Sequence, residues 1–76
     1  MSNYCYVYIL ESLAPAGGYY VGLTEDLSAR LAKHNAGEVP HTAKLRPWQI
    51  KTAVSFRNRI KAAAFEKYLI PTSLDN

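Results

Sequence analysis

The sequence predicts an α+β, sandwich-like fold: a small three-stranded sheet, antiparallel or mixed, flanked by helices in the order β-β-α-β-α. Two segments rich in aromatic and β-branched residues are separated by a Pro- and Gly-containing turn, which is typical of a β-hairpin. Two later segments carry helix-start and helix-stop residues, with a strand-like segment between them. With 76 residues, we expect a single domain covering 1–76.

The hairpin is predicted from residues 4–22. Every residue from 4 to 10 is aromatic, β-branched or apolar, which indicates a strand. Residues 14–18 have turn chemistry, and residues 19–22 form a second short strand that we expect to pair antiparallel with the first. Alternation along the first strand places one set of side chains on one face (Tyr4, Tyr6, Tyr8, Leu10) and another on the opposite face (Cys5, Val7, Ile9).

A first helix is predicted to follow. Thr24 is the expected N-cap, and two acidic residues after it place negative charge in the first turn. The helix runs to about Ala36, where Gly37 ends it. Leu27 and Leu31 form its apolar stripe, so this face should pack on the sheet.

A loop over residues 37–47 leads to a third strand over residues 48–56, on which we expect Ile50, Val54 and Phe56 to share one face. Trp48 is interpreted as a core residue. A second helix is then predicted to begin at an Asn58 cap, to reach about Leu69 and to end at Pro71, leaving the last five residues frayed. Its apolar stripe comprises Ala62, Phe65 and Leu69, with Glu66 at the margin.

Composition restricts the class of protein only loosely. Nine Lys and Arg residues against six Asp and Glu give a net charge of +3, which favours polyanionic partners but is common in other proteins. The single cysteine, Cys5, cannot form an internal disulfide, and the apolar run 7–10 is too short for a signal core or a membrane span. We therefore expect a cytoplasmic protein with no membrane association.

Several residues form a motif only when they are taken in order. Each has an ordinary explanation by itself: tyrosines are favoured in strands, an Arg and a His four residues apart form a solvated helix face, and a marginal Glu forms a salt bridge. The ordered set is Tyr6-Val7-Tyr8, Tyr20-Val21-Gly22, Arg30 ten residues after Tyr20, His34 and Glu66. This set resembles the GIY-YIG nuclease family.

The resemblance covers roughly residues 4–69 and is greatest to the small, single-domain bacterial members. It includes the segments 41–44, 46–48 and 65–69, and it extends to the N-terminal nuclease domain of the ABC excinuclease. It implies a metal-dependent endonuclease that hydrolyses phosphodiester bonds in DNA, in repair or processing. A protein partner for targeting is compatible with it, because so small a domain lacks specificity modules.

The resemblance implies a role for each motif residue. Glu66 would be the sole protein ligand of one Mg²⁺ or Mn²⁺ ion, and Arg30 would hold the scissile phosphate. We favour Tyr8 as general base with His34 as proton relay and Tyr20 as an orienter, although the assignment between the two tyrosines stays open. The backbone phosphates of DNA, or alternatively of RNA, would be bound by six basic residues: Lys33, Lys44, Arg46, Arg57, Arg59 and Lys61. Cys5 and His41 are interpreted as a structural and a loop residue.

Three departures from the family pattern keep alternatives open. Tyr6 stands where the first motif has Gly, and Leu23 stands where a Lys is common. Relatives continue after the Glu-containing segment with a Lys and a basic stretch rich in Ser and Gly, whereas here the segment is followed by residues 70–76. Family members also commonly have an Asn about a dozen residues after the Glu, and we give that role to no residue because Asn76 is only ten residues after Glu66 and lies beyond Pro71. The alternatives are a nucleic-acid-binding module with little or no catalytic activity and an interaction domain whose aromatic face binds a protein.

Overall fold

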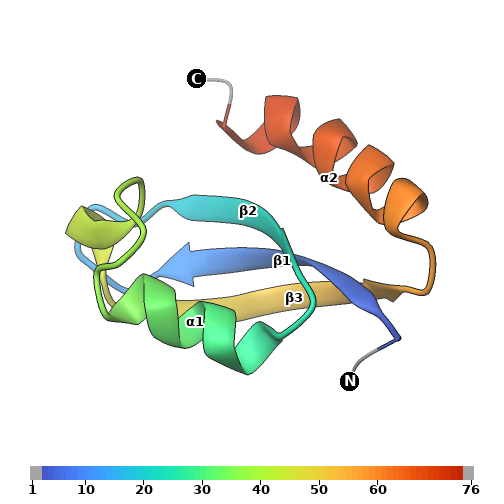
Figure 1. Ribbon diagram of the computed structural model, residues 1–76. Coiled ribbons are helices and arrows are strands. Elements are labelled where there is room, and N and C mark those ends of the chain that lie inside the picture. Colours follow the sequence, from blue (N-terminus) through green and yellow to red (C-terminus); the bar gives the residue numbers. More distant parts are fainter. Residues whose placement is uncertain (1–2, 75–76) are drawn as a thin grey trace.

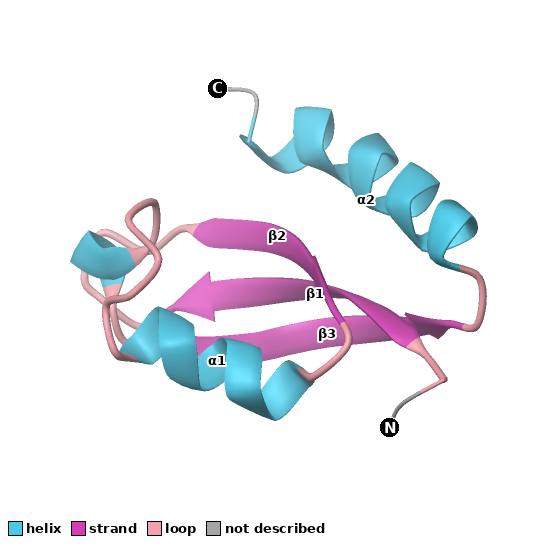
Figure 2. Ribbon diagram, viewed as in Figure 1, coloured by secondary structure: helices cyan, strands magenta, loops and turns pink. Residues whose placement is uncertain are grey.

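The computed structural model describes the backbone of residues 3–74, with side chains through Ile70, as a sheet that has one helix on each face (Figure 1). The three strands are antiparallel to their neighbours in the order β2-β1-β3. The elements are β1 (Cys5–Ser12), β2 (Tyr19–Thr24), α1 (Leu27–Asn35), a 3-10 turn η1 (Ala43–Leu45), β3 (Trp48–Phe56) and α2 (Arg59–Leu74). The predicted fold class and element order are confirmed (Figure 2).

The hairpin of β1 and β2 forms as predicted, with β2 two residues longer than expected. Tyr8 pairs with Gly22 across the two strands. Gly17 and Gly18 in the connecting turn have φ angles of 70° and 129°, which residues with a Cβ rarely adopt. β1 becomes the central strand because β3 pairs along its other edge.

Alternation along β1 divides the core into two clusters, as the sequence predicts. Tyr8 and Leu10 face α1, together with Trp48, and the partly buried Leu27 and Leu31 of α1 pack against them. The opposite face carries Cys5 and Val7 toward α2, and the cluster there includes the predicted apolar stripe of that helix. The cluster on the α2 side consists of Cys5, Val7, Val21 and Ala62, surrounded by Ile9, Leu23, Phe56, Phe65, Leu69 and Ile70.

The prediction that Ile50, Val54 and Phe56 share one face of β3 is wrong, because the strand contains a bulge. Ile9 pairs with Thr52 while Leu10 pairs with Ile50, so Lys51 is the extra residue. An extra residue reverses the alternation beyond it. Ile50 therefore packs in the cluster beneath α1, whereas Phe56 packs in the cluster beneath α2. Val54 pairs with Val7, which lies on the α2 face, and remains 40% exposed.

The start of α1 also differs from the prediction. The N-cap is Asp26, whose side chain accepts a hydrogen bond from the backbone N–H of Ala29 at 3.0 Å. The Thr24 hydroxyl instead accepts from the backbone N–H of Asp26 at 3.1 Å, so it closes a turn just before the helix. The end is as expected: Gly37 has a φ of 81°, the left-handed conformation that stops a helix.

The end of α1 is tied to the start of β3 by two hydrogen bonds from one side chain. The Asn35 amide accepts from the Trp48 backbone N–H at 2.7 Å and donates to the Trp48 carbonyl at 3.1 Å. One amide thus replaces a strand partner at the beginning of β3 and sets the position of α1 over the sheet.

Helix α2 begins as predicted, because the Asn58 side chain accepts from the Lys61 backbone N–H at 3.0 Å. It does not end at Pro71 but continues to Leu74, so the frayed end expected there is wrong for residues 72–74. A proline removes one backbone donor, and Leu69 and Ile70 hold the preceding turn against the core. Asn76 lies outside the described residues. No helix within residues 3–74 is long and apolar enough to cross a membrane.

Candidate active site

A chain of hydrogen bonds runs through the space between the sheet and α1. The Tyr8 hydroxyl of β1 lies 3.0 Å from Nε2 of His34 in the last turn of α1. Nδ1 of His34 lies 2.8 Å from the Thr42 hydroxyl in the loop before η1. All three side chains are buried. His34 is thus not the solvated helix residue that its isolated position in the sequence would suggest.

The partners of Thr42 determine which nitrogen of His34 carries the proton. The Thr42 hydroxyl donates its hydrogen to the carbonyl of Val39 at 3.3 Å, so it is left to accept from His34 Nδ1. In a neutral imidazole the other nitrogen, Nε2, is then an acceptor, and the Tyr8 hydroxyl donates to it. Burial lowers the pKa of His34, and the neighbouring Arg30 charge lowers it further, so the ring is neutral near pH 7.

Arg30 approaches the same phenol from the preceding turn of α1. Its Nε–H donates to the Tyr8 hydroxyl at 3.3 Å. This hydrogen bond is the main reason that the pKa of Arg30 is raised, and the nearby Tyr20 hydroxyl adds to the shift. Burial raises the pKa of the Tyr8 phenol above its usual value, although the Arg30 contact opposes that shift. Tyr8 therefore keeps its proton in the free protein, and that proton is directed at His34.

The glycine of the second motif makes room for this arrangement. Gly22 lies opposite Tyr8 on the neighbouring strand, and the Tyr8 ring extends over it. A Cβ at position 22 would collide with the Tyr8 hydroxyl and the adjoining ring atoms. Gly22 is needed here for close approach, since no unusual φ angle is required of it.

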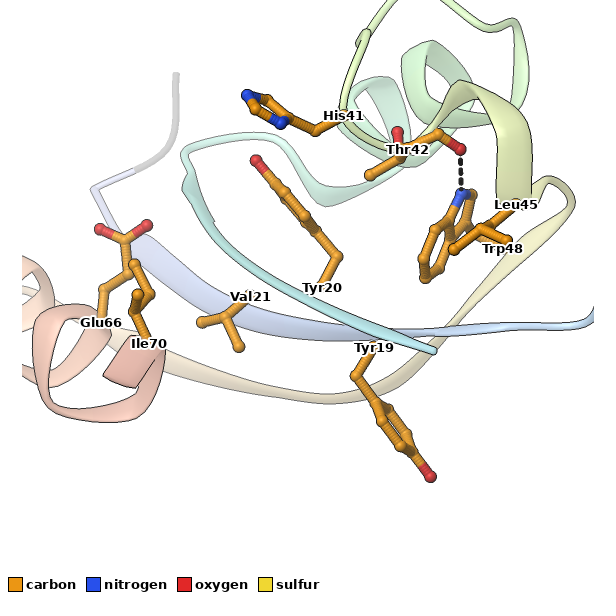
Figure 3. Close-up of a pocket in the computed structure, with 9 residues that line it drawn as sticks. All are labelled: Tyr19, Tyr20, Val21, His41, Thr42, Leu45, Trp48, Glu66 and Ile70. Carbon is orange, nitrogen blue, oxygen red and sulfur yellow. Dashed lines mark hydrogen bonds between the residues drawn. The ribbon is translucent and has the colours of Figure 1, made fainter. Parts of the chain in front are cut away.

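Tyr20 and Glu66 line an open cleft of about 450 Å³ next to this cluster, along β2 (Figure 3). Glu66 is half-buried on α2, and Tyr20 projects between it and His41 of the loop before η1. The Tyr20 ring contacts the His34 ring edge to face, with centroids 4.9 Å apart. Tyr20 therefore contacts His34 of the hydrogen-bonded cluster and also lines the cleft. The five motif residues are thus linked. Tyr8, Arg30, His34 and Tyr20 form a chain of contacts, and Glu66 lines the same cleft as Tyr20.

The six basic residues expected at a nucleic-acid surface are all exposed. Arg59 already has a partner, an exposed salt bridge to Glu25 at 3.3 Å. Arg57 lies over the Tyr4 ring, with 5.7 Å between the guanidinium carbon and the ring centroid. Arg46 donates to the carbonyl of Ala43. Three of the six thus have contacts within the protein, and the residues that line the cleft include none of the six.

A comparison with models of protein families matches residues 4–76 to the GIY-YIG catalytic domain. The chain belongs to the GIY-YIG family. The membership predicted from the ordered motif is therefore confirmed.

Similar proteins come from fungi and from bacteria. The structure-specific endonuclease subunit SLX1 of Ajellomyces capsulatus is 39% identical over 69 residues, which cover 83% of this chain and 16% of that protein. The same-named protein of Paracoccidioides brasiliensis is equally similar, so this GIY-YIG chain spans about a sixth of the fungal relatives. The UPF0213 protein of Streptococcus pneumoniae is 34% identical over 91% of this chain and 69% of its own length. No solved structure matches the chain.

Two residues of the site region are given no functional role by the sequence analysis of single positions. His41 is predicted to be a loop residue, and it does lie in a loop, but it also lines the cleft. The Thr42 hydroxyl is hydrogen-bonded to Nδ1 of His34. Both lie in a segment without helical or strand periodicity, so no pattern of burial could place them; only the resemblance over residues 41–44 draws attention to that segment.

Proposed function

We propose that this domain is a metal-dependent endonuclease that hydrolyses phosphodiester bonds in DNA. The observation that carries the proposal is the hydrogen bond from Tyr8 to a neutral His34, with Arg30 on the same phenol and Glu66 in the adjoining cleft. Such a cluster supplies a proton acceptor, a phosphate-binding cation and a free carboxylate within one small region. Membership of the GIY-YIG family supports the same chemistry.

Glu66 is the residue that we propose to hold the metal. Within the described part of the chain, no three His, Cys, Asp or Glu side chains lie close enough together to form a metal site. A single carboxylate in an open cleft leaves most positions around an ion to water and phosphate oxygens, which suits Mg²⁺ or Mn²⁺ rather than Zn²⁺. When bound, such an ion supplies Lewis acidity toward the phosphate and the departing 3′ oxygen.

Tyr8 and His34 would together accept the proton of the attacking water. Since the pKa of Tyr8 is raised, its phenol needs an acceptor for its own proton, and Nε2 of His34 is already hydrogen-bonded to it. As the water attacks phosphorus and the bond to the 3′ oxygen breaks, Tyr8 takes the water proton and passes its own to His34. Thr42 accepts from Nδ1 of the resulting imidazolium.

Access to the water depends on Arg30 and Tyr20. Tyr8 is only 1% exposed and Tyr20 lines the cleft, so a water bound in the free protein would meet Tyr20 first. The guanidinium of Arg30 occupies one side of the Tyr8 hydroxyl through a 3.3 Å hydrogen bond. We propose that Arg30 turns to the scissile phosphate when DNA binds, which frees that side of Tyr8, while Tyr20 orients the water.

The wider role is proposed on less direct grounds. The exposed basic residues would contact backbone phosphates without reading sequence. A function in DNA repair or processing, in the cytoplasm and with a protein partner that directs the domain to its target, remains a prediction. A second candidate function, nucleic-acid binding without cleavage, would use the same surface and would leave Glu66 without a role.

The decisive experiment is a cleavage assay with end-labelled duplex, branched and single-stranded DNA in Mg²⁺, in Mn²⁺ and in EDTA. Glu66→Gln and Arg30→Ala are tested beside Glu38→Gln, a matched change at an exposed carboxylate on the loop after α1. We expect metal-dependent cleavage that is lost in the first two variants and retained in Glu38→Gln. A folded wild-type protein that binds DNA without cutting any of these substrates would support the binding module instead.

A further inference from the structure

The cleft extends well beyond the carboxylate that we propose to hold the metal. Figure 3 shows Glu66 and Ile70 at one end, Leu45 and Trp48 at the other, and Tyr20 between them, with the His41 ring on the side of the Tyr20 hydroxyl. The far end of the cleft, from Tyr20 and His41 to Leu45 and Trp48, is thus aromatic and apolar. Glu66 is the only carboxylate among the lining residues whose side chains the structure describes. A phosphate and a metal account for the first end and leave the second without an occupant.

The wall at the far end is held in place before any ligand binds. The Trp48 indole is buried and donates to the carbonyl of Thr42 at 2.8 Å. The carbonyl of Leu45 accepts from the Ser12 hydroxyl of β1 at 2.6 Å. His41 is exposed and directly precedes the buried Thr42, so its backbone is anchored while its ring stays accessible. This end is therefore a preformed surface rather than a loose loop.

We propose that this far end binds the base of an unpaired nucleotide next to the scissile phosphate, with the ring of His41 stacking on it. The inference rests on the proposed nuclease function and names its substrate class: DNA in which a nucleotide at the cleavage point is not base-paired. Aromatic and apolar side chains that stack on a base, without hydrogen bonds to its edge, accept any base sequence.

Size and polarity both fit one nucleotide. The cleft volume of about 450 Å³ falls within the range of small-ligand sites. A nucleotide joins an anionic phosphate to a flat, largely apolar base, and the cleft likewise joins a polar end at Glu66 to an aromatic end at His41 and Trp48. In an intact duplex the bases are stacked inside the helix, and an enzyme reaches one only if it is unpaired or flipped out.

The experiment removes the base on the DNA and the ring on the protein, separately and together. Cleavage is measured on a duplex whose nucleotide beside the cleavage point is unpaired, and on the same DNA with an abasic analogue at that nucleotide. Wild type is compared with His41→Ala and His41→Phe. Because stacking on an aromatic residue contributes about 1–3 kcal/mol per base, each single deletion should lower kcat/KM by roughly 5- to 150-fold. The abasic change should lower the kcat/KM of His41→Ala much less than it lowers that of wild type.

Two variants identify what the ring does. His41→Phe keeps a flat ring without a charge or a hydrogen-bonding group, and we expect it to retain sensitivity to the abasic change. Lys44 lies on η1 and outside the cleft. Lys44→Ala should therefore lower kcat/KM equally on natural and abasic DNA. The proposal is overturned if the losses from His41→Ala and from the abasic change simply multiply, or if His41→Phe behaves like His41→Ala.

Binding affinities of wild type and His41→Ala for the natural and the abasic DNA are also measured in EDTA, by fluorescence anisotropy of the labelled DNA. A protein that binds but does not cleave would refute the nuclease function, while the coupling between His41 and the base would still be seen. Cleavage without such coupling would instead refute the base-binding site and leave the nuclease function intact. The two failures are therefore distinguishable.

Discussion

The Tyr8 hydroxyl donates a hydrogen bond to His34 Nε2 at 3.0 Å, and the side chains that form it are no more than 1% exposed. The pKa of Tyr8 is raised and that of His34 is lowered, mainly by burial in both cases. Both groups are therefore neutral near pH 7, with the proton on the phenol. This is the resting state that a base needs when it must pass its own proton on as it takes another.

The first prediction separates the roles of the two tyrosines. Tyr8→Phe removes the proton acceptor, so we expect the single-turnover cleavage rate to fall by about 10²–10⁴-fold, the usual contribution of a general base. Tyr20→Phe removes only an orienting hydroxyl and should cost less. Rates are measured with saturating protein in Mg²⁺. A larger loss in Tyr20→Phe than in Tyr8→Phe would make Tyr20, which lines the cleft, the base.

The second prediction concerns acid pH. Because the pKa of folded His34 lies below its usual value of 6.5, the unfolded chain takes up a proton at a higher pH than the native protein does. The contribution of His34 to stability is thus fully present above pH 6.5 and is lost as the pH falls below it. Cleavage should decline in the same acid range, because a protonated Nε2 cannot accept from Tyr8.

The test of this acid limb uses His34→Gln, which cannot titrate. Denaturant unfolding is followed from pH 7.5 to 5 for wild type and variant, and we expect a shallower loss of stability in the variant. The Thr42 and Tyr8 hydroxyls and the Arg30 guanidinium surround the ring and do not titrate in this range. Parallel pH profiles for the two proteins would contradict the prediction.

The third prediction tests why position 22 is glycine. Gly22→Ala should destabilise the fold by about 1–3 kcal/mol through overpacking, and it should reduce cleavage by displacing the Tyr8 hydroxyl. In a Tyr8→Ala background the obstructing ring is gone, so the same change should cost little. A double-mutant cycle of unfolding free energies measures this coupling. Equal costs in both backgrounds would mean that backbone conformation, rather than the Tyr8 contact, requires glycine.

Alternation and cap chemistry are enough to predict most of the fold. Tyr8 and Val7 face opposite layers because neighbouring residues of a strand do so, and Gly37 stops α1 because it adopts a positive φ. The face of Ile50 cannot be predicted in this way, because a bulge depends on pairing with β1 and leaves no local pattern. The N-cap is ambiguous because Thr24 and Asp26 are both good caps, and only the turn closed by Thr24 decides between them.

The site could be predicted from residue order but not from burial. Periodicity indicates that Arg30 and His34 lie one turn apart, and the family resemblance suggests the roles that we propose for them. The buried His34 is hydrogen-bonded at both nitrogens, to Tyr8 and to Thr42. Thr42 lies eight residues after His34 in an irregular loop, so no periodicity predicts its contact. The cleft depends on α2 lying beside β2, a tertiary contact that no single segment encodes.

The fourth prediction concerns the link between α1 and β3. Asn35→Ala removes an acceptor for the Trp48 backbone N–H and a donor to its carbonyl. A hydrogen-bonding group left without a partner costs about 1–3 kcal/mol when it is buried. Since these two bonds are only partly buried, the free energy of unfolding should fall by up to that amount. Asn35→Asp keeps only the acceptor and should lie between wild type and Asn35→Ala. Denaturant unfolding checks the order of the three proteins.

The fifth prediction is that binding to DNA depends on salt through the basic residues identified from the sequence. Each phosphate contact contributes about 0.9 to the slope of log K against log salt on duplex DNA. Lys33→Ala and Lys44→Ala should each lower that slope by about one if the residue contacts a phosphate. Arg59→Ala should change it less, because its guanidinium is already paired with Glu25 at 3.3 Å.

Lys51→Ala provides the matched control for the salt experiment. Lys51 is exposed at the bulge of β3, with its ammonium 5.6 Å from the centroid of the Tyr19 ring, and it is not among the residues predicted to contact DNA. Anisotropy titrations from about 50 to 200 mM salt, a range over which phosphate contacts change affinity strongly, would give the slope for each variant. If Lys51→Ala lowers the slope as much as Lys44→Ala does, binding reflects the net charge of +3 rather than a defined surface, and the assignment of the six basic residues fails.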